Sequence, residues 1–417
     1  MTIKLAPLRG MKDLLPAEYR AHKHIENVAF NISKLYGFQG FGTPIVESAS
    51  VFDRTLGSSS DVVSKEMYSF QDKKGRILSL RPEFTASIMR AILSNGLKQD
   101  LPLKLFSSGP LFRYDRPQEG RQRQFHQLNF ENIGVNTPYS DAEIISLASH
   151  ILKELGCLND VTLELNSLGC NISRQNYQAA LIEYFSQYSN DLSTDSLNRL
   201  TQNPMRILDS KDLGDRKIVS DAPLISKFYT SESLSYFNDV QKYLNDLNIN
   251  YIINEKIVRG LDYYSHTAFE FTTIKLGAQT SVLAGGRYDR LSCLMGDKNE
   301  IPSIGFAMGV ERILLLKDFN IARERSVFIL PIDSESFDYS IKLAQQLRLN
   351  NIAVNIEFTG KISKRMQVAI NANARYSIFI GSDEMNNNSY KLKDLDSSLE
   401  QEVNLENLMN IVNNQSL

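Results

Sequence analysis

One strand constrains this chain more than any other feature, because its two faces differ in character. In the stretch FRYDRPQEGRQRQFHQLNFE, residues 112–131, a Pro-Gln-Glu-Gly turn is followed by residues that alternate with the two-residue period of a strand. One face carries Leu128 and Phe130. The other carries an aromatic ring, two amides and a carboxylate: Phe125, Gln127, Asn129 and Glu131. Such a strand packs on a core with one face and lines a polar pocket with the other.

Four arginines flank the same turn: Arg113, Arg116, Arg121 and Arg123. Guanidinium groups suit bidentate contacts with phosphate, so the hairpin favours a phosphate-rich ligand. Taken alone, the turn fits an ordinary hairpin with a solvated, charged tip better than a binding site. The rest of the sequence has to decide between the two.

Size and composition limit the possible classes of protein. A length of 417 residues corresponds to about two to three domains. The formal net charge of −2 argues against a DNA-coating role, since contacts with nucleic acid must come from local basic patches. The N-terminus lacks the apolar core of a signal peptide, and no segment approaches the ~20 apolar residues of a membrane helix. We therefore expect a cytoplasmic protein with no membrane partner.

Cysteine and histidine are few and scattered. Cys157, Cys170 and Cys293 are odd in number and widely spaced, so we expect neither a disulfide framework nor a protein-bound metal such as zinc. His22 and His24 fall on a predicted N-terminal helix, where we interpret them as solvated.

The N-terminal third begins with a helix over residues 17–36. GFQGFGTPIVES is predicted to be a short strand with Pro44 near its middle, at an edge or interface. Pro82 marks the expected start of a helix, which would place Glu83 and Thr85 in its first turn, facing whatever lies at the helix N-terminus.

The remaining pattern predicts two domains. In the first, residues 1–325, a helix is capped by Ser140 or Asp141, and a mostly helical subdomain is inserted at about 170–254. In the second, residues 326–417, the apolar runs SVFILPI, IAVNIEF and YSIFIGS alternate with helical segments, as in a small α/β domain.

Three further segments resemble the hairpin in combining arginine with glycine or aromatic residues. VRGLDYYSHTAFEF places Arg259 and Gly260 before two tyrosines, AGGRYDRL places two glycines before Arg287, and IGFAMGVERILLL opens a helix with Glu311 and Arg312. Glycine lets backbone approach a ligand closely, and arginine at a helix N-terminus favours anions. Singly, each segment fits a surface turn, core aromatics or a surface charge. Together with the hairpin arginines they indicate a triphosphate clamp beside a flat ring, without a P-loop or a Rossmann fingerprint.

These segments, in this order, resemble the bacterial histidyl-tRNA synthetase family of class II aminoacyl-tRNA synthetases over essentially the whole chain. GFGTPIVES, FRYD…RQRQF and GFAMGVER are similar to the three class II motifs, and VRGLDYYS and AGGRYD to the two segments peculiar to the histidine enzymes. The resemblance implies an α/β (α+β) fold: an antiparallel-sheet catalytic domain with a helical insertion and a C-terminal α/β anticodon-binding domain. It also implies histidine–tRNA ligase activity and a homodimer joined through the first motif.

The resemblance assigns the ATP site. Arg113 would hold the α-phosphate and the substrate carboxylate region, Phe125 and Arg312 would stack on the two faces of adenine, and Arg121 would reach the γ-phosphate. Arg259 would stabilise the charge that develops on the α-phosphate as the amino-acid carboxylate attacks. Mg²⁺ would bridge the departing pyrophosphate.

It also assigns the histidine site. The amino group and imidazole would be held by four side chains: Glu83, Thr85, Gln127 and Glu131. Tyr263 and Tyr264 would close the ring pocket, with Arg113 and Arg259 near the substrate carboxylate. A neutral imidazole has one donating and one accepting nitrogen, and a carboxylate together with a hydroxyl can form hydrogen bonds with both. Such a pocket needs no editing domain.

Two residues depart from the family pattern. Phe84 in RPEFT stands where the family has glycine, which leaves the backbone path beside Glu83 open. Asp115 in FRYD is one methylene shorter than the usual glutamate, so an acceptor role toward the adenine amino group would involve water.

The C-terminal domain is expected to read the anticodon of tRNA(His). Its helix KISKRMQVAINANARY begins with a modest basic group, Lys361, Lys364 and Arg365, which on charge alone fits a solvated face better. The rival interpretation of the whole chain is a synthetase-like regulatory subunit of ATP phosphoribosyltransferase. A nucleic-acid-binding module without catalysis would leave the polar strand and the glycine segments unexplained.

Overall fold

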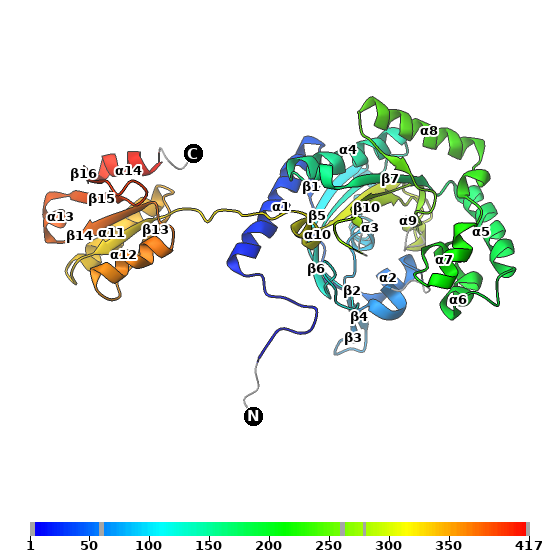
Figure 1. Cartoon of the computed structure of the whole chain (residues 1–417), viewed down its shortest axis with the longest axis horizontal. Helices are drawn as coiled ribbons and strands as arrows, with labels where there is room; N and C mark the ends of the chain where they lie inside the picture. The colour runs from blue at the N-terminus through cyan, green and yellow to red at the C-terminus, as the bar shows by residue number, and fades with distance from the viewer. Residues whose placement is uncertain (1–4, 58–61, 259–262, 278–280, 414–417) are drawn as a thin grey trace. The chain divides into compact units, whose positions relative to one another are not determined.

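The computed structural model describes residues 5–57, 62–258, 263–277 and 281–413. The chain divides into two compact units, Met1–Asn320 and Ile321–Leu417 (Figure 1).

The first unit is built on an eight-stranded sheet. In spatial order its strands are β1 (Gln39–Gly40), β5 (Leu103–Phe112), β6 (Gln124–Ile133), β11 (Ser303–Gly309), β10 (Ser281–Arg287), β9 (Ser265–Thr272), β7 (Thr162–Ser167) and β8 (Ile252–Ile253). Neighbours are antiparallel except at the two edges, where β1 pairs with β5 and β8 pairs with β7 in parallel. The predicted antiparallel-sheet fold is confirmed.

The two faces of β6 differ as its alternation predicts. Leu128 and Phe130 are 2% and 0% exposed and join the core, where the ring of Phe130 stacks on that of Phe306 with centroids 4.5 Å apart. On the other face Phe125 and Gln127 line a cleft. The strand therefore separates the main core from the candidate site.

Helices that contribute apolar side chains to this core are α1 (Pro16–Leu35), α4 (Pro138–Glu154), α8 (Ser231–Asp246) and α10 (Val310–Leu316). A second core cluster is built with α2 (Ala49–Thr55), α3 (Thr85–Ser94) and α9 (Leu291–Leu294). A separate three-stranded sheet has the order β2 (Val46–Ser48), β4 (Ile77–Leu80) and β3 (Ser69–Gln71).

Pro44 does not interrupt a strand, contrary to the prediction. The segment GFQGFGTPIVES divides into β1, at the edge of the large sheet, and β2, in the small sheet. Pro44 lies in the connection between them, where its missing N–H costs no ladder hydrogen bond.

The cap predicted for α4 is also wrong. Thr137 is the N-cap and its hydroxyl accepts from the Ser140 amide at 3.2 Å, with Pro138 at the first helical position. Asp141 is instead fully buried and accepts from Arg287 Nε at 3.1 Å. Arg287, also 0% exposed, is therefore an interior ion-pair partner and not a surface charge.

The inserted region is helical as predicted and contains α5 (Asn171–Ser186), α6 (Thr194–Gln202), α7 (Leu213–Ser220) and α8. Asp215 is its buried hub. The carboxylate accepts from the Ser193 amide at 2.8 Å and from the hydroxyls of Ser193, Ser196 and Ser210 at 2.7, 2.6 and 2.6 Å. One side chain thus joins the start of α6, the chain before α7, and α7 itself.

The second unit has a five-stranded sheet with the order β13 (Val354–Ile356), β12 (Val327–Pro331), β14 (Tyr376–Ile380), β15 (Ser389–Asp394) and β16 (Glu400–Asn404). The first three strands are parallel, and they are the three apolar runs seen in the sequence. The helices of this unit are α11 (Ser336–Leu349), α12 (Ile362–Asn371), α13 (Ser382–Asn387) and α14 (Leu405–Asn413). The predicted C-terminal α/β arrangement is confirmed.

The basic group expected on α12 is smaller than predicted. Arg365 is 9% exposed and donates from Nε to the Gly360 carbonyl at 2.9 Å and from Nη1 to the Pro331 carbonyl. It fastens the helix to its own sheet. Lys361 and Lys364 are exposed.

Two further features concern the whole described chain. Cys157, Cys170 and Cys293 are free thiols. Among the helices in the described ranges, none has the length and apolar character required to cross a membrane.

Asp215→Asn should lower the free energy of unfolding by about 2 kcal/mol at neutral pH, because an amide cannot accept from all these donors. Burial alone would raise the pKa of Asp215, but its hydrogen bonds outweigh burial and lower that pKa. The carboxylate therefore stabilises the fold above its unfolded pKa of about 3.9 and stops doing so as the pH falls through the lower folded pKa. Urea denaturation should show the difference between wild type and variant narrowing in acid. The substitution of an exposed aspartate, Asp246→Asn, is the control. Equal losses of unfolding free energy in the two variants would contradict the stabilising role of the Asp215 carboxylate.

Candidate active site

A cleft of about 1030 Å³ opens on the polar face of the large sheet. It brings together residues that are far apart in sequence, from α3, the β5–β6 hairpin, the chain before β9, β10 and the start of α10. The predicted site residues that line it are Glu83, Thr85, Arg113, Asp115, Arg121, Phe125, Gln127, Tyr263, Tyr264 and Arg312. Arg259 lies outside the described residues.

Three guanidinium groups meet in one half of the cleft. The side chain of Arg113 donates from Nε to the Pro82 carbonyl at 2.9 Å, and its guanidinium carbon lies 5.3 Å from the centroid of the Phe125 ring. Burial lowers the pKa of Arg312, and the charges of Arg113 and Arg121 lower it further. A site that holds mutually repelling cations beside an aromatic ring is suited to a polyanion that carries a flat ring.

Two predicted ATP contacts are engaged with each other in this structure. Asp115 forms an ion pair with Arg121, whose Nη2 also lies 3.7 Å from the Glu66 carboxylate. The hairpin arginine is thereby held across the turn. A bound phosphate would compete with these carboxylates for Arg121.

At the other end of the cleft, Glu131 is buried behind the lining residue Thr85. This predicted histidine contact is therefore not itself part of the cleft lining. The Glu131 side chain is 1% exposed and accepts from the Thr85 hydroxyl at 2.6 Å and from the Tyr288 phenol. Burial raises its pKa to about 8, against the lowering effect of the two hydroxyls. Gly305, opposite Glu131 on β11, makes room for the carboxylate, since a Cβ there would lie 1.7 Å from Oε2.

Glu83 lies two residues before Thr85, the first residue of α3. The Glu83 carboxylate accepts from the backbone amides of Thr85 and Ala86 at 2.8 and 2.7 Å, so it satisfies two free donors of the helix N-terminus. Phe84, the departure from the family pattern, is 2% exposed, and the guanidinium of Arg81 lies 4.3 Å from its ring centroid. The phenylalanine therefore packs inward and leaves Glu83 on the cleft wall.

Three tyrosine rings lie together near Glu131, and two of them, Tyr263 and Tyr264, line the cleft. The Tyr263 ring centroid lies 4.7 Å from that of Tyr264 and 5.7 Å from that of Tyr288, and all three side chains are buried. Burial raises the pKa of Tyr263 and of Tyr288, so both phenols stay protonated and can donate hydrogen bonds. The cleft is lined here by two tyrosine rings with a carboxyl group behind them, which suits a small, flat, nitrogen-containing side chain.

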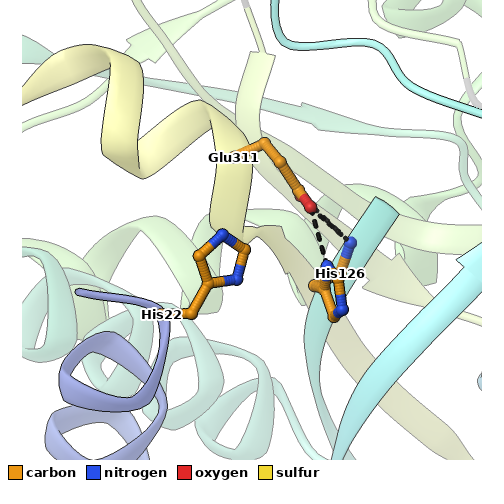
Figure 2. A group of neighbouring side chains, drawn as sticks. All are labelled: His22, His126 and Glu311. Atoms are coloured by element: carbon orange, nitrogen blue, oxygen red, sulfur yellow. Dashed lines mark hydrogen bonds and ion pairs between the residues drawn. The ribbon is translucent and has the colours of Figure 1, made fainter. Parts of the chain in front are cut away.

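His22 is not solvated, contrary to the prediction. It is 8% exposed and its ring meets that of His126 edge to face, with centroids 5.0 Å apart. Figure 2 shows both rings beside Glu311, which accepts from His126 Nδ1 at 2.8 Å and, with both oxygens, from the His126 amide at 3.0 Å. Burial lowers the pKa of His22. Since His126 lies between Phe125 and Gln127, this contact ties α10 to the strand that lines the cleft.

Sequence reasoning missed several residues in and behind the cleft. Tyr288, next to Arg287, does not line the cleft but donates to the Glu131 carboxyl behind it, a contact between distant segments that no local pattern indicates. Glu270 lines the cleft, and its signal in the sequence is a carboxylate within an otherwise apolar strand. The inserted subdomain supplies Arg199, Arg206 and Lys211 to the lining, which no local pattern indicates.

An antiparallel sheet with this strand order, a cleft that joins three arginines to a pair of tyrosines backed by a buried carboxyl, and a separate α/β unit define a class II aminoacyl-tRNA synthetase. The particular family follows from two matches. The family model for histidyl-tRNA synthetase covers residues 10–313, and that for an anticodon binding domain covers residues 326–415. The chain belongs to the histidyl-tRNA synthetase family, as its motifs predict.

Relatives agree with this assignment. The histidine–tRNA ligase of Rickettsia bellii is 57% identical over 400 residues, 96% of each chain, and that of Rickettsia felis is 53% identical over 99% of each. The crystal structure of the apo histidyl-tRNA synthetase of S. aureus superposes with a TM-score of 0.83 at 32% identity, covering 98% of this chain and 100% of that one. A Bacillus halodurans structure described as an ATP phosphoribosyltransferase regulatory subunit/histidyl-tRNA synthetase has a TM-score of 0.66 at 23% identity, which shows a shared fold.

Glu131→Gln should become more stable relative to wild type as the pH rises from 5 to 8. The folded protein keeps the Glu131 proton up to a pKa of about 8, whereas the unfolded chain releases it near ~4.3. Wild type therefore loses stability across this interval, and glutamine has no proton to lose. The thermal unfolding midpoint at the two pH values measures the effect, with the exposed Glu183→Gln as control. If the difference in thermal unfolding midpoint between wild type and variant does not change with pH, the Glu131 carboxyl is not protonated in the folded protein as predicted.

Proposed function

We propose that this chain activates L-histidine with ATP and transfers it to the 3′ end of tRNA(His). The observation that carries the proposal is the division of one cleft into two chemically different halves. One half gathers Arg113, Arg121 and Arg312 around Phe125. The other is lined by Thr85, Tyr263 and Tyr264, and behind them the buried carboxyl of Glu131 accepts a hydrogen bond from Thr85.

The arginine half is suited to ATP. Phe125 and Arg312 would sandwich adenine, Arg113 would contact the α-phosphate, and Arg121 would exchange its Asp115 partner for the γ-phosphate. Their mutual repulsion would be relieved by a bound polyphosphate, which gives binding energy without a Walker loop. Asp115 would then be released for the adenine amino group.

The carboxyl half is suited to histidine. Glu131, already contacted by two hydroxyl donors, would meet one imidazole nitrogen, while Tyr263 and Tyr264 would enclose the ring. Glu83 and Gln127 on the cleft wall, with Thr85, would hold the amino group. This arrangement would direct the histidine carboxylate toward the arginine half.

The reaction would then need no proton transfer in its first step. A carboxylate oxygen of histidine attacks the α-phosphorus, the bond to the bridging oxygen breaks, and pyrophosphate leaves. In the second step a ribose hydroxyl of the tRNA attacks the activated carbonyl and AMP leaves. Arg113 would stabilise the negative charge at phosphorus, a task that the family resemblance also gives to Arg259.

Mg²⁺ would accompany the pyrophosphate group. Hard divalent cations prefer oxygen ligands, and the carboxylates of Glu66 and Glu270 line the cleft beside the arginines. These groups, with the phosphate oxygens themselves, are the donors that we infer for the ion.

The alternative, a regulatory subunit of ATP phosphoribosyltransferase, is less supported. A chain that only bound a regulatory ligand would have no need of the arginine half. Histidine–tRNA ligases from Rickettsia species match the chain at 51–57% identity over nearly its full length.

For the C-terminal domain we propose a boundary near residue 326, with 1–325 catalytic and 326–417 reading the anticodon. Every cleft residue named above precedes Lys317. Removal of residues from about 326 onward should therefore spare pyrophosphate exchange and sharply weaken charging of tRNA. An unchanged KM for tRNA in a truncated, still dimeric protein would rule out the anticodon role.

We also propose that the protein is cytoplasmic, because tRNA charging takes place in the cytoplasm. We further propose that it forms a homodimer. The small sheet and the segment before it expose four apolar side chains, between 42% and 57%: Ile45, Val46, Phe70 and Ile77. A second copy of this surface would cover them. Analytical ultracentrifugation of the active enzyme tests the state, and a fully active monomer would exclude it.

Pyrophosphate exchange with each of the twenty amino acids tests the function most simply. We expect exchange with histidine alone, because a site built to pair with imidazole leaves polar groups unpaired with any other side chain, a discrimination of roughly 10⁴-fold or more. Exchange with a different amino acid, or none with histidine, would refute the proposal. Arg113→Ala should abolish exchange, whereas the exposed Arg116→Ala should not.

A further inference from the structure

A cluster of two histidines and a glutamate lies directly behind the adenine-binding strand. His22 comes from α1, His126 from β6 and Glu311 from the start of α10, and one ligand atom from each lies within 4.8 Å of the others (Figure 2). The motifs that carry the proposed reaction do not use His22 or the His126 ring.

His22 is the unexplained member. Its side chain is more than nine-tenths buried, yet within the described part of the chain its imidazole makes a ring contact with His126 and no hydrogen bond. In Figure 2 the His22 ring is turned toward the space between His126 and Glu311.

We propose that His22, His126 and Glu311 bind a divalent transition-metal ion of the zinc class, separate from the Mg²⁺ that accompanies ATP. Two imidazoles and a carboxylate are a complete set of protein ligands for such an ion, with water in the fourth position.

The geometry requires only small side-chain movements. With bonds of about 2.0–2.2 Å in a tetrahedral site, ligand atoms lie roughly 3.3–3.5 Å apart. His126 Nδ1 and Glu311 Oε1 are 2.8 Å apart, and the largest separation in the cluster is at most 4.8 Å. Shifts on the order of 1 Å would satisfy the metal. One Glu311 oxygen can bind the ion while the other keeps its hydrogen bond to the His126 amide.

The ligand types select the metal. Mg²⁺ and Ca²⁺ prefer all-oxygen ligands, whereas imidazole nitrogen suits zinc, cobalt, nickel and copper. Such an ion would therefore prefer this cluster to the carboxylate-lined phosphate region of the cleft. It would join α1 to β6 and α10, the two elements that carry Phe125 and Arg312, and so stabilise the wall of the adenine site.

The test is metal binding to the full-length, EDTA-treated protein. We expect one Zn²⁺ per chain by isothermal titration calorimetry, a visible absorption band with Co²⁺ that indicates a tetrahedral site, and a thermal unfolding midpoint that rises by a few degrees with Zn²⁺. His22→Asn should weaken binding at least roughly tenfold and abolish the cobalt band and the thermal shift. Without metal, its pyrophosphate exchange should equal that of wild type.

His24→Asn, on the same helix, is the matched control and should bind as wild type does. This pair also separates the cluster from adventitious binding at the free cysteines. If His22→Asn proves unstable, His126→Gln is the second variant, judged by the cobalt band. Absence of stoichiometric binding, or equal binding by wild type and His22→Asn, would overturn the proposal and leave the cluster as a hydrogen bond between His126 and Glu311 with a histidine packed beside it.

Discussion

The rest of the site depends on one interaction, the pair of hydrogen bonds that the buried carboxyl of Glu131 accepts. Removing a carboxyl from water is costly, and here two hydroxyls, from Thr85 and Tyr288, offset part of the cost. Because these hydrogen bonds offset burial only in part, burial still raises the pKa of Glu131 to about 8. A group held in this state has a strong preference for a ligand that completes its hydrogen bonds, and this preference underlies the proposed choice of histidine.

Much of the first unit can be understood as support for that carboxyl. α3 begins at Thr85 and is oriented by Glu83, β11 has a glycine at 305 where a side chain would displace the carboxylate, and the segment after β10 brings Tyr288 from the other side. Behind Tyr288, the ion pair of Arg287 with Asp141 fastens this segment to α4. The arginine half of the cleft uses the same strand, since Phe125 and Glu131 lie on one face of β6.

The periodic parts of this architecture were predictable from sequence. The alternation of β6, the helix at 17–36 and the three apolar strands of the second unit are local patterns, and each formed as expected. Of the site residues matched to family motifs, the structure brings all but two to one cleft: Glu131 is buried behind the lining, and Arg259 lies outside the described residues.

What the sequence did not reveal depends on contacts between distant segments. Asp141 looks like a helix cap until Arg287 is placed beside it, and Arg365 looks like a surface charge until Pro331 and Gly360 are seen to accept from it. The ring of His22 contacts that of His126, which lies more than a hundred positions away in the sequence. Hydrophobic periodicity carries no information about such pairs, because any of these polar residues is also common at a surface.

The central claim is that the Glu131 carboxyl, held by its hydroxyl donors, recognises the imidazole. The most direct measurement is the KM for histidine in pyrophosphate exchange by Tyr288→Phe, which removes one donor and keeps the ring. Tyr177→Phe, a buried phenol of the inserted subdomain, is the matched control. The account predicts a rise in the histidine KM of roughly tenfold, about 1.4 kcal/mol, with the ATP KM unchanged. An unchanged histidine KM, or an equal rise in both KM values, would contradict it.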